Sequence, residues 1–254
     1  MATFKLIGRV GLLKISSPPV NALGLAVRKG IVDGIAQAEK AGAKALVLAG
    51  DGVTFPAGAD IAEFATGGHR TQPTLGEVIE RLDKASMPTV AAMHGTALGG
   101  GLEVALACHW RVMSKAAKCG LPEVHLGLLP GAGGTQRLPR LIGCAPAIKI
   151  MTSGAPLGAA EAAKLGLADE VVAAVDGEGV AEAAVGFAEA LADGVDPSRV
   201  VSARPLEVEG GVEAFFGAAR EGARQAAKGE LAPLLIVDAV RAAAEAPSFE
   251  AGLS

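Results

Sequence analysis

The alternation of hydrophobic and polar positions at the start of the chain predicts strands before helices. Apolar residues fill two short runs, 4–7 and 10–15, and the Gly-Arg pair between them suits a tight hairpin turn. After the break at Pro18-Pro19, the spacing of apolar residues over 22–41 predicts a helix, and 44–48 (KALVL) predicts a buried strand. The chain therefore opens as two strands, a helix and a strand.

A second cycle of the same kind follows. A helix is predicted over about 75–85, an apolar strand over 89–93, and a helix over 102–108, directly after the glycine cluster 99–101. Repeated alternation of strands and helices is typical of an α/β fold in which helices cover a sheet.

Alanine dominates the chain from Gly154 onward, where the pattern predicts helices with one strand near 170–175. Between 211 and 227 the apolar residues recur at i, i+3, i+4, i+7 and i+11, on one stripe of a helix. Pro233 suits the start of a further helix. The Gly, Asp and Pro residues of 193–197 mark the nearest thing to a boundary, so we predict a core over 1–195 and a helical C-terminal region over 196–254.

Composition and charge narrow the class of protein. The 254 residues carry 23 Lys and Arg against 27 Asp and Glu, so there is no basic excess to hold a nucleic-acid backbone. Three cysteines without CxxC spacing predict reduced thiols. The uncharged stretch 85–102 contains a proline and four glycines, which argues against a membrane span. Lys5, Arg9 and Lys14 interrupt the N-terminal apolar residues, which argues against a secretory signal and predicts a cytoplasmic protein.

Two glutamates stand in otherwise apolar, glycine-rich surroundings. Glu103 follows three glycines at the predicted start of a helix, where unpaired N–H groups favour negative charge and could hold an oxyanion. Glycine also lets a ligand approach the backbone closely. Glu103 and Glu123 could divide acid and base roles if their environments separate their pKa values. The alternative interpretation is two tight turns, one helix-terminal glutamate and one solvated loop glutamate.

Other chemistries find less support in the sequence. The four histidines show no metal-ligand spacing, and no GxSxG elbow of a serine hydrolase is present. A strand over 124–129 leading into 131–134 would suit a nicotinamide-dependent oxidoreductase, but the third glycine of that fingerprint is replaced by Gln136. Arg137 and Arg140 suggest a solvated or salt-bridged face, with binding of ligand phosphates as the alternative.

Four motifs occur together in a fixed order: 18–23 (PPVNAL), 55–61 (FPAGADI), 95–103 (GTALGGGLE), and 121–123 (LPE) followed by 131–137 (GAGGTQR). In order and spacing they closely resemble the enoyl-CoA hydratase/isomerase (crotonase) family, most strongly from about residue 4 to 175. His109 after Cys108, together with 128–134, is most similar to the hydratase module of multifunctional fatty-acid oxidation proteins. The resemblance implies an α/β fold, a crotonase-like spiral of β-β-α units with a helical C-terminal region.

The resemblance also implies a site and a reaction. The N–H groups of Ala57 and Gly100 would stabilise an enolate-like thioester oxygen, while Glu103 activates water and Glu123 delivers a proton. Substrate-binding residues would be Ala22, Leu23, Ala59, Asp60, Ile61 and Gly131, and Asp60 also suits a capping role at the following turn. Pro56, next to the expected donor Ala57, departs from the common family pattern.

The presence of both glutamates favours hydration of trans-2-enoyl-CoA to 3-hydroxyacyl-CoA in fatty-acid β-oxidation. The alternatives are an isomerase or another acyl-CoA reaction of the family, and a non-catalytic assembly subunit. We expect no metal and no cofactor, since coenzyme A is part of the substrate. The resemblance to standalone hydratases implies a homotrimer or a dimer of trimers, with neither nucleic acid nor membrane as partner.

Overall fold

The computed structural model describes residues 1–191, 194–227 and 229–253. Within these residues, a six-stranded sheet holds, in spatial order, β1 (Ala2–Ile7), β2 (Val10–Ile15), β3 (Ala45–Gly50), β4 (Thr89–Met93), β6 (Trp110–Ser114) and β9 (Glu170–Val172). β1 and β2 form the predicted antiparallel hairpin, and all other neighbours are parallel. A smaller sheet holds β5 (Thr96–Leu98), β7 (Lys118–Gly120) and β8 (Leu157–Gly158).

Helices connect the strands and cover the larger sheet. The α-helices are α1 (Leu25–Lys40), α2 (Ala62–Thr66), α3 (Leu75–Asp83), α4 (Gly100–Ala107), α5 (Gly134–Ile142), α6 (Cys144–Ser153), α7 (Ala159–Lys164), α8 (Gly177–Glu189), α9 (Val212–Ala226), α10 (Ala232–Glu245) and α11 (Phe249–Leu253). Short 3₁₀ turns are η1 (Gly68–Arg70), η2 (Glu123–Leu126), η3 (Pro197–Arg199) and η4 (Val201–Ala203).

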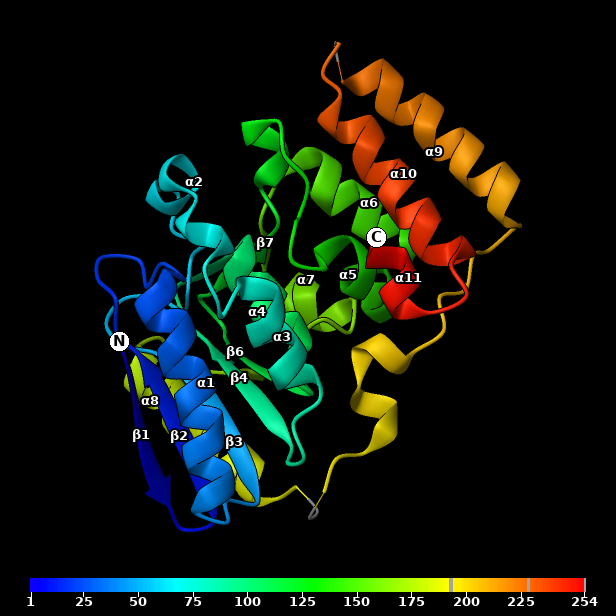
Figure 1. The fold of residues 1–254 in the computed structure, drawn as a ribbon. Coiled ribbons are helices and arrows are strands. Elements are labelled where there is room, and N and C mark those ends of the chain that lie inside the picture. The colour runs from blue at the N-terminus through cyan, green and yellow to red at the C-terminus, as the bar shows by residue number, and fades with distance from the viewer. Residues whose placement is uncertain (192–193, 228, 254) are drawn as a thin grey trace.

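The larger sheet is buried on both faces, which explains why its central strands are continuous apolar runs. On β3, Leu46 and Leu48 belong to the core formed with α1, α3 and α4. The alternate residues Ala45, Val47 and Ala49 belong to a second core formed with α8. Figure 1 shows α1 in front of the sheet and α8 behind it.

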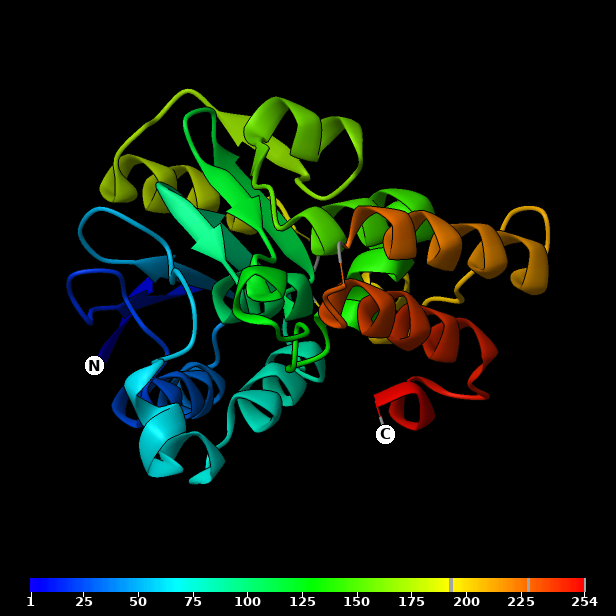
Figure 2. The ribbon, with the colours of Figure 1, turned by 90° about the horizontal axis from the view of Figure 1, so that it is seen from above.

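The successive strand, strand and helix units confirm the predicted α/β architecture, and the C-terminal region is helical as expected. The α9–α10 hairpin lies to one side of the sheet in Figures 1 and 2, where α10 packs against α5 and α6. The predicted boundary stretch 193–197 begins at Asp193, which lies outside the described residues. The division into 1–195 and 196–254 therefore stays a prediction.

Two predicted elements differ from the structure. The helix predicted over 22–41 begins only at Leu25, because Asn21 adopts a left-handed backbone (φ 55°) and the Leu23 N–H donates to Gly58 O at 3.0 Å. The strand over 124–129, on which the oxidoreductase alternative depended, is absent from the described residues. That region begins instead with the 3₁₀ turn η2.

Candidate active site

A cleft of about 930 Å³ opens where the loop after β3, the start of α4 and the segment after β7 meet. Figure 1 shows α2 and the segment after β7 at the same end of the molecule. The cleft is lined by most of the predicted site residues: Leu23, Ala57, Ala59, Asp60, Ile61, Gly100, Glu103, Glu123 and Gly131. Residues far apart in the sequence are thus brought to one place.

Ala22 is the predicted binding residue that does not line this cleft. The chain turns at Asn21, and Ala22 O accepts the Gly24 N–H at 2.9 Å. This turn leaves Leu23, rather than Ala22, at the floor of the cleft. Ala22 therefore stays a predicted binding residue, next to Leu23, which does line the cleft.

The glycines before α4 allow two backbone segments to touch. Gly99 has a left-handed φ of 52°, and its N–H donates to Gly120 O at 2.9 Å. A Cβ on Gly101 would lie 1.7 Å from Pro56 O, so only glycine fits there. The start of α4 therefore rests directly on the loop that carries the 55–61 motif. Gly100 is the first residue of α4, and its N–H has no acceptor within the helix.

The second predicted N–H donor, Ala57, was a wrong assignment. Its N–H already donates to Val20 O at 3.1 Å and is therefore engaged within the protein. Ala59 takes its place: its N atom lies 3.3 Å from where a Cβ on Gly100 would stand. Across the described ranges, no acceptor takes the Ala59 N–H. Ala59 and Gly100 thus form a pair of neighbouring N–H groups at the cleft.

Glu103 on α4 is almost fully buried, with 3% of its surface exposed. Its Oε1 accepts the N–H groups of Ala132 at 2.7 Å and Gly134 at 2.8 Å. Burial raises the pKa of Glu103, although the two N–H donors and the Arg137 guanidinium oppose that rise. The carboxyl group is thus held in one orientation by the backbone at the start of α5.

Glu123 opens the turn η2, and its carboxyl group lies over the glycine loop. A Cβ on Gly99 would be 3.1 Å from Glu123 Oε1. Its other oxygen, Oε2, is buried and meets no hydrogen-bond partner among the residues that the structure describes. Burial, and secondarily the negative charge of Glu103, raises the pKa of Glu123 to about 7. The alternative of a solvated loop glutamate does not fit this environment.

Asp60 has the structural role that was expected. Its Oδ1 accepts the Ala62 N–H at 3.1 Å, at the start of α2. Ile61 and Phe64 next to it are exposed at the edge of the cleft, and the Phe64 ring stacks on His69 with centroids 4.6 Å apart. This side of the cleft therefore presents apolar surface.

The cysteines and His109 lie away from the cleft. In 1–191, 194–227 and 229–253, no group of His, Cys, Asp and Glu is arranged to hold a metal ion. The three cysteines are buried and free, and burial raises the pKa of Cys108 and Cys119 to about 12. His109 accepts the Thr89 N–H at Nδ1, 3.0 Å away. No helix in the described part of the chain is long and apolar enough to cross a membrane.

Arg137 and Arg140 do not line the cleft. Arg137 is buried and pairs with Asp83 at 3.4 Å, and both guanidinium groups lie over the ring of Phe249 from α11. The salt-bridged interpretation therefore holds for Arg137, on a buried rather than a solvated face.

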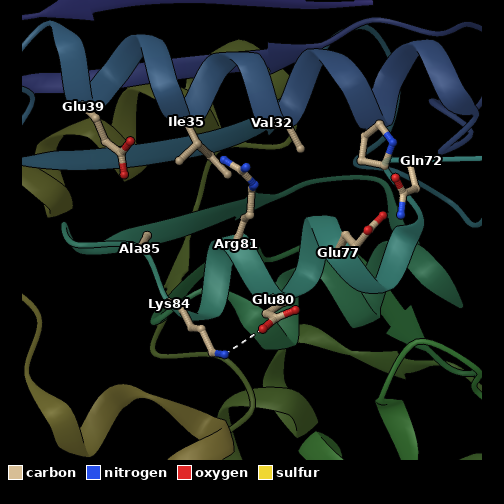
Figure 3. Close-up of a pocket in the computed structure, with 10 residues that line it drawn as sticks. Val32, Ile35, Glu39, Gln72, Glu77, Glu80, Arg81, Lys84 and Ala85 are labelled. Atoms are coloured by element: carbon tan, nitrogen blue, oxygen red, sulfur yellow. Dashed lines mark hydrogen bonds and ion pairs between the residues drawn. The ribbon is translucent and has the colours of Figure 1, made fainter.

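A second hollow, of about 610 Å³, lies between α1 and α3 (Figure 3). Three of its charged side chains have local partners: Glu80 binds Lys84 at 2.7 Å, and Glu77 completes the capping box of Thr74 at the start of α3. Glu77 and Glu80 are thus engaged within the protein, whereas Glu123 in the larger cleft has a buried oxygen without a partner among the described residues, so we take the cleft of Glu103 and Glu123 as the candidate active site.

Comparison with known proteins shows the family of the chain. The family model described as enoyl-CoA hydratase/isomerase matches residues 7–203. The peroxisomal bifunctional enzyme of Danio rerio is 42% identical over 245 residues, which are 96% of this chain and 33% of that protein. A probable enoyl-CoA hydratase of Bacillus subtilis is 44% identical over 164 residues, 62% of this chain and 64% of that protein.

The crystal structure of enoyl-CoA hydratase from Bacillus anthracis superimposes with a TM-score of 0.68 at 27% identity, covering 95% of this chain and 90% of that one. The chain spans about a third of the length of the peroxisomal relative. Since the family model matches most of the chain, and the fold and motifs agree with it, the protein belongs to the enoyl-CoA hydratase/isomerase family.

Proposed function

We propose that this chain adds water to trans-2-enoyl-CoA thioesters and forms 3-hydroxyacyl-CoA, as in fatty-acid β-oxidation. One observation carries the proposal: the cleft pairs a backbone-fixed carboxylate with a second carboxyl group whose pKa is raised to about 7. Two carboxyl groups in different environments can act as base and acid at the same pH. The names of similar proteins, a probable enoyl-CoA hydratase among them, support this choice.

In the proposed reaction the N–H groups of Ala59 and Gly100 bind the thioester oxygen. Negative charge develops there when a nucleophile adds to C3, and each well-aimed donor typically contributes about 3 to 4 kcal/mol of transition-state stabilisation. Glu103, as the carboxylate, removes a proton from water while the water oxygen bonds to C3. Glu123, as the acid, gives its proton to C2. The net reaction adds one water molecule across the C2–C3 double bond. Proton exchange with solvent then returns Glu103 to the carboxylate and Glu123 to the acid.

The experiment follows the fall in enoyl absorbance after mixing crotonyl-CoA with the wild type, Glu103→Gln, Glu123→Gln and the double variant. Each single substitution keeps size and hydrogen bonding but removes proton transfer, so kcat should fall about 10² to 10⁴-fold with substrate binding little changed. The double variant should lose far less than the product of the single losses, because the pair acts as a unit. A fully active Glu123→Gln protein, or a wild type inactive on every enoyl chain length, would refute the proposal.

The same assay separates the alternatives. An isomerase would convert a 3-enoyl-CoA without adding water, and a non-catalytic assembly subunit would do neither. As parts of the proposal we keep a reaction without metal or added cofactor, a cytoplasmic location and a homotrimer or dimer of trimers. Family resemblance supports the assembly, and sedimentation of a stable monomer would contradict it.

A further inference from the structure

One wall of the cleft has little hydrophobic anchoring. The segment 57–76 lines a large share of the cleft, with Ile61, Phe64 and Leu75 among its apolar side chains. Yet neither α2 nor η1, which form its middle, contains a buried residue. Segments with few buried apolar contacts open at low free energy. Some other interaction must therefore hold this wall in place.

That interaction is centred on Arg28 of α1, a side chain with only 2% of its surface exposed. All five of its N–H donors meet an acceptor. The acceptors are Pro73 O at 2.7 Å from Nε, Leu23 O at 3.0 Å and Glu63 Oε2 at 2.6 Å from Nη1, and Gly68 O at 3.1 Å and Thr71 O at 3.2 Å from Nη2. Four of these five acceptors belong to residues 63–73, so a single side chain binds the wall along most of its length.

Glu63, in the wall, also binds the start of α1. Its Oε1 accepts the Leu25 N–H at 2.6 Å, at the start of α1, where the N-cap Gly24 offers no side chain for this purpose. One carboxylate therefore pairs with Arg28 and caps the helix that carries Arg28. Removing Glu63 would leave the buried Arg28 guanidinium without its counter-charge.

The groups proposed to perform the chemistry are held by backbone bonds, and Arg28 reaches them only through its bond to Leu23 O. The turn that carries Ala59 is fixed by the Leu23 N–H on Gly58 O, and Glu103 is fixed by the backbone of α5. Loosening the wall should therefore disturb the apolar surface of the cleft more than the reacting centre.

We propose that Arg28 is a positioning residue for the acyl chain: by binding residues 63–73 of the wall, it fixes the apolar surface that we take the acyl chain to contact, and so sets the preference for chain length. The inference rests on the proposed function, because it takes the ligand to be an acyl-CoA. The contact that the wall offers grows with each methylene of the ligand, whereas contacts at the thioester are the same for every chain.

The test compares Arg28→Gln, Arg28→Lys and the control Lys29→Gln, which removes a cation at the next, exposed position of α1. KM and kcat are measured with crotonyl-CoA and with a ten-carbon enoyl-CoA. In Arg28→Gln, KM for the ten-carbon ester should rise about tenfold relative to that for crotonyl-CoA, the contribution of roughly two buried methylenes. Arg28→Lys, which can still pair with Glu63, should recover part of the loss, and Lys29→Gln should behave as the wild type.

A parallel loss of kcat on both esters, with their KM ratio unchanged, would overturn the proposal. If Arg28→Gln does not fold, Glu63→Gln serves instead, since its amide oxygen can still accept the Leu25 N–H while the ion pair is lost. The same rise in the KM ratio is then expected, with faster hydrogen exchange of residues 63–73.

Calorimetry with butanoyl-CoA and decanoyl-CoA keeps this inference separate from the proposed function, because these saturated esters bind without turnover. A wild type that binds both but hydrates nothing would refute the hydratase. The inference about Arg28 would then still be tested by binding: Arg28→Gln should lose affinity for decanoyl-CoA but not for butanoyl-CoA. A wild type that binds neither ester would overturn both proposals.

Discussion

The carboxyl group of Glu123 should make the protein less stable at alkaline pH, and Glu123→Gln should remove that loss. Its pKa rises from 4.5 to about 7 in the folded protein, chiefly because the group is buried. A raised pKa means that folding favours the protonated form. The stabilising contribution of Glu123 is complete at pH values below its pKa in the unfolded chain. It is lost as the pH rises through its pKa in the folded protein.

The magnitude follows from the shift itself. A rise of about 2.5 pKa units corresponds to about 3 kcal/mol at roughly 1.4 kcal/mol per unit. Between pH 5 and pH 9 the wild type should lose about 2 to 3 kcal/mol that the glutamine variant, with no proton to release, keeps. The variant should thus gain relative stability at high pH while it loses the proposed proton transfer to C2.

Urea denaturation of the wild type and Glu123→Gln, each at pH 5 and pH 9, measures this difference. Glu161→Gln on α7, an exposed position, is the matched control and should show no such gain. If the free energies of unfolding of wild type and Glu123→Gln differ by the same amount at both pH values, the carboxyl group is not desolvated as described. The acid role assigned to it would then lose its physical basis.

Two further substitutions test how the backbone forms the site. Gly101→Ala places a Cβ 1.7 Å from Pro56 O and should cost more than about 3 kcal/mol of folding stability. Gly186→Ala, in the open interior of α8, should instead stabilise the protein by about 0.5 to 1 kcal/mol. Thermal melts of the two variants measure the difference, and equal stability of both would contradict the close contact. Asn21→Ala removes three hydrogen bonds of 2.7 to 2.8 Å and leaves alanine at φ 55°. The free energy of unfolding, measured by urea titration, should therefore fall by about 3 kcal/mol. Asn21→Gly relieves only the backbone strain, so its free energy of unfolding should lie between those of the wild type and Asn21→Ala.

The spacing of apolar residues was sufficient to predict the helices and strands that have a clear periodicity. The hairpin, the buried strands β3 and β4 and the stripe of α9 follow from the spacing of apolar residues, and the structure confirms them. The short strands β5, β7 and β8 have three residues or fewer, too few for a periodic pattern to be recognised.

The site depended on contacts that no local pattern records. The 55–61 motif predicts a glycine-containing turn, but which N–H remains free depends on Val20 O, which takes that of Ala57. The importance of Arg28 was also missed. The sequence did hold a signal for it: Ile31 and Ile35 follow Arg28 at spacings of three and seven residues, which places a cation on the buried face of a helix. Its acceptors, however, come from loops that the spacing cannot place.

The contact between Gly101 and Pro56 O also bears on how such a site tolerates mutation. Because backbone meets backbone there, the separation of the Ala59 and Gly100 N–H groups does not depend on the side chains nearby. Replacing side chains around the cleft can then change which acyl group enters, or which proton moves, while the anion-binding geometry persists. Selection could therefore diversify substrates and acid–base chemistry at positions such as 63 and 123 without rebuilding the part of the site proposed to bind the thioester oxygen.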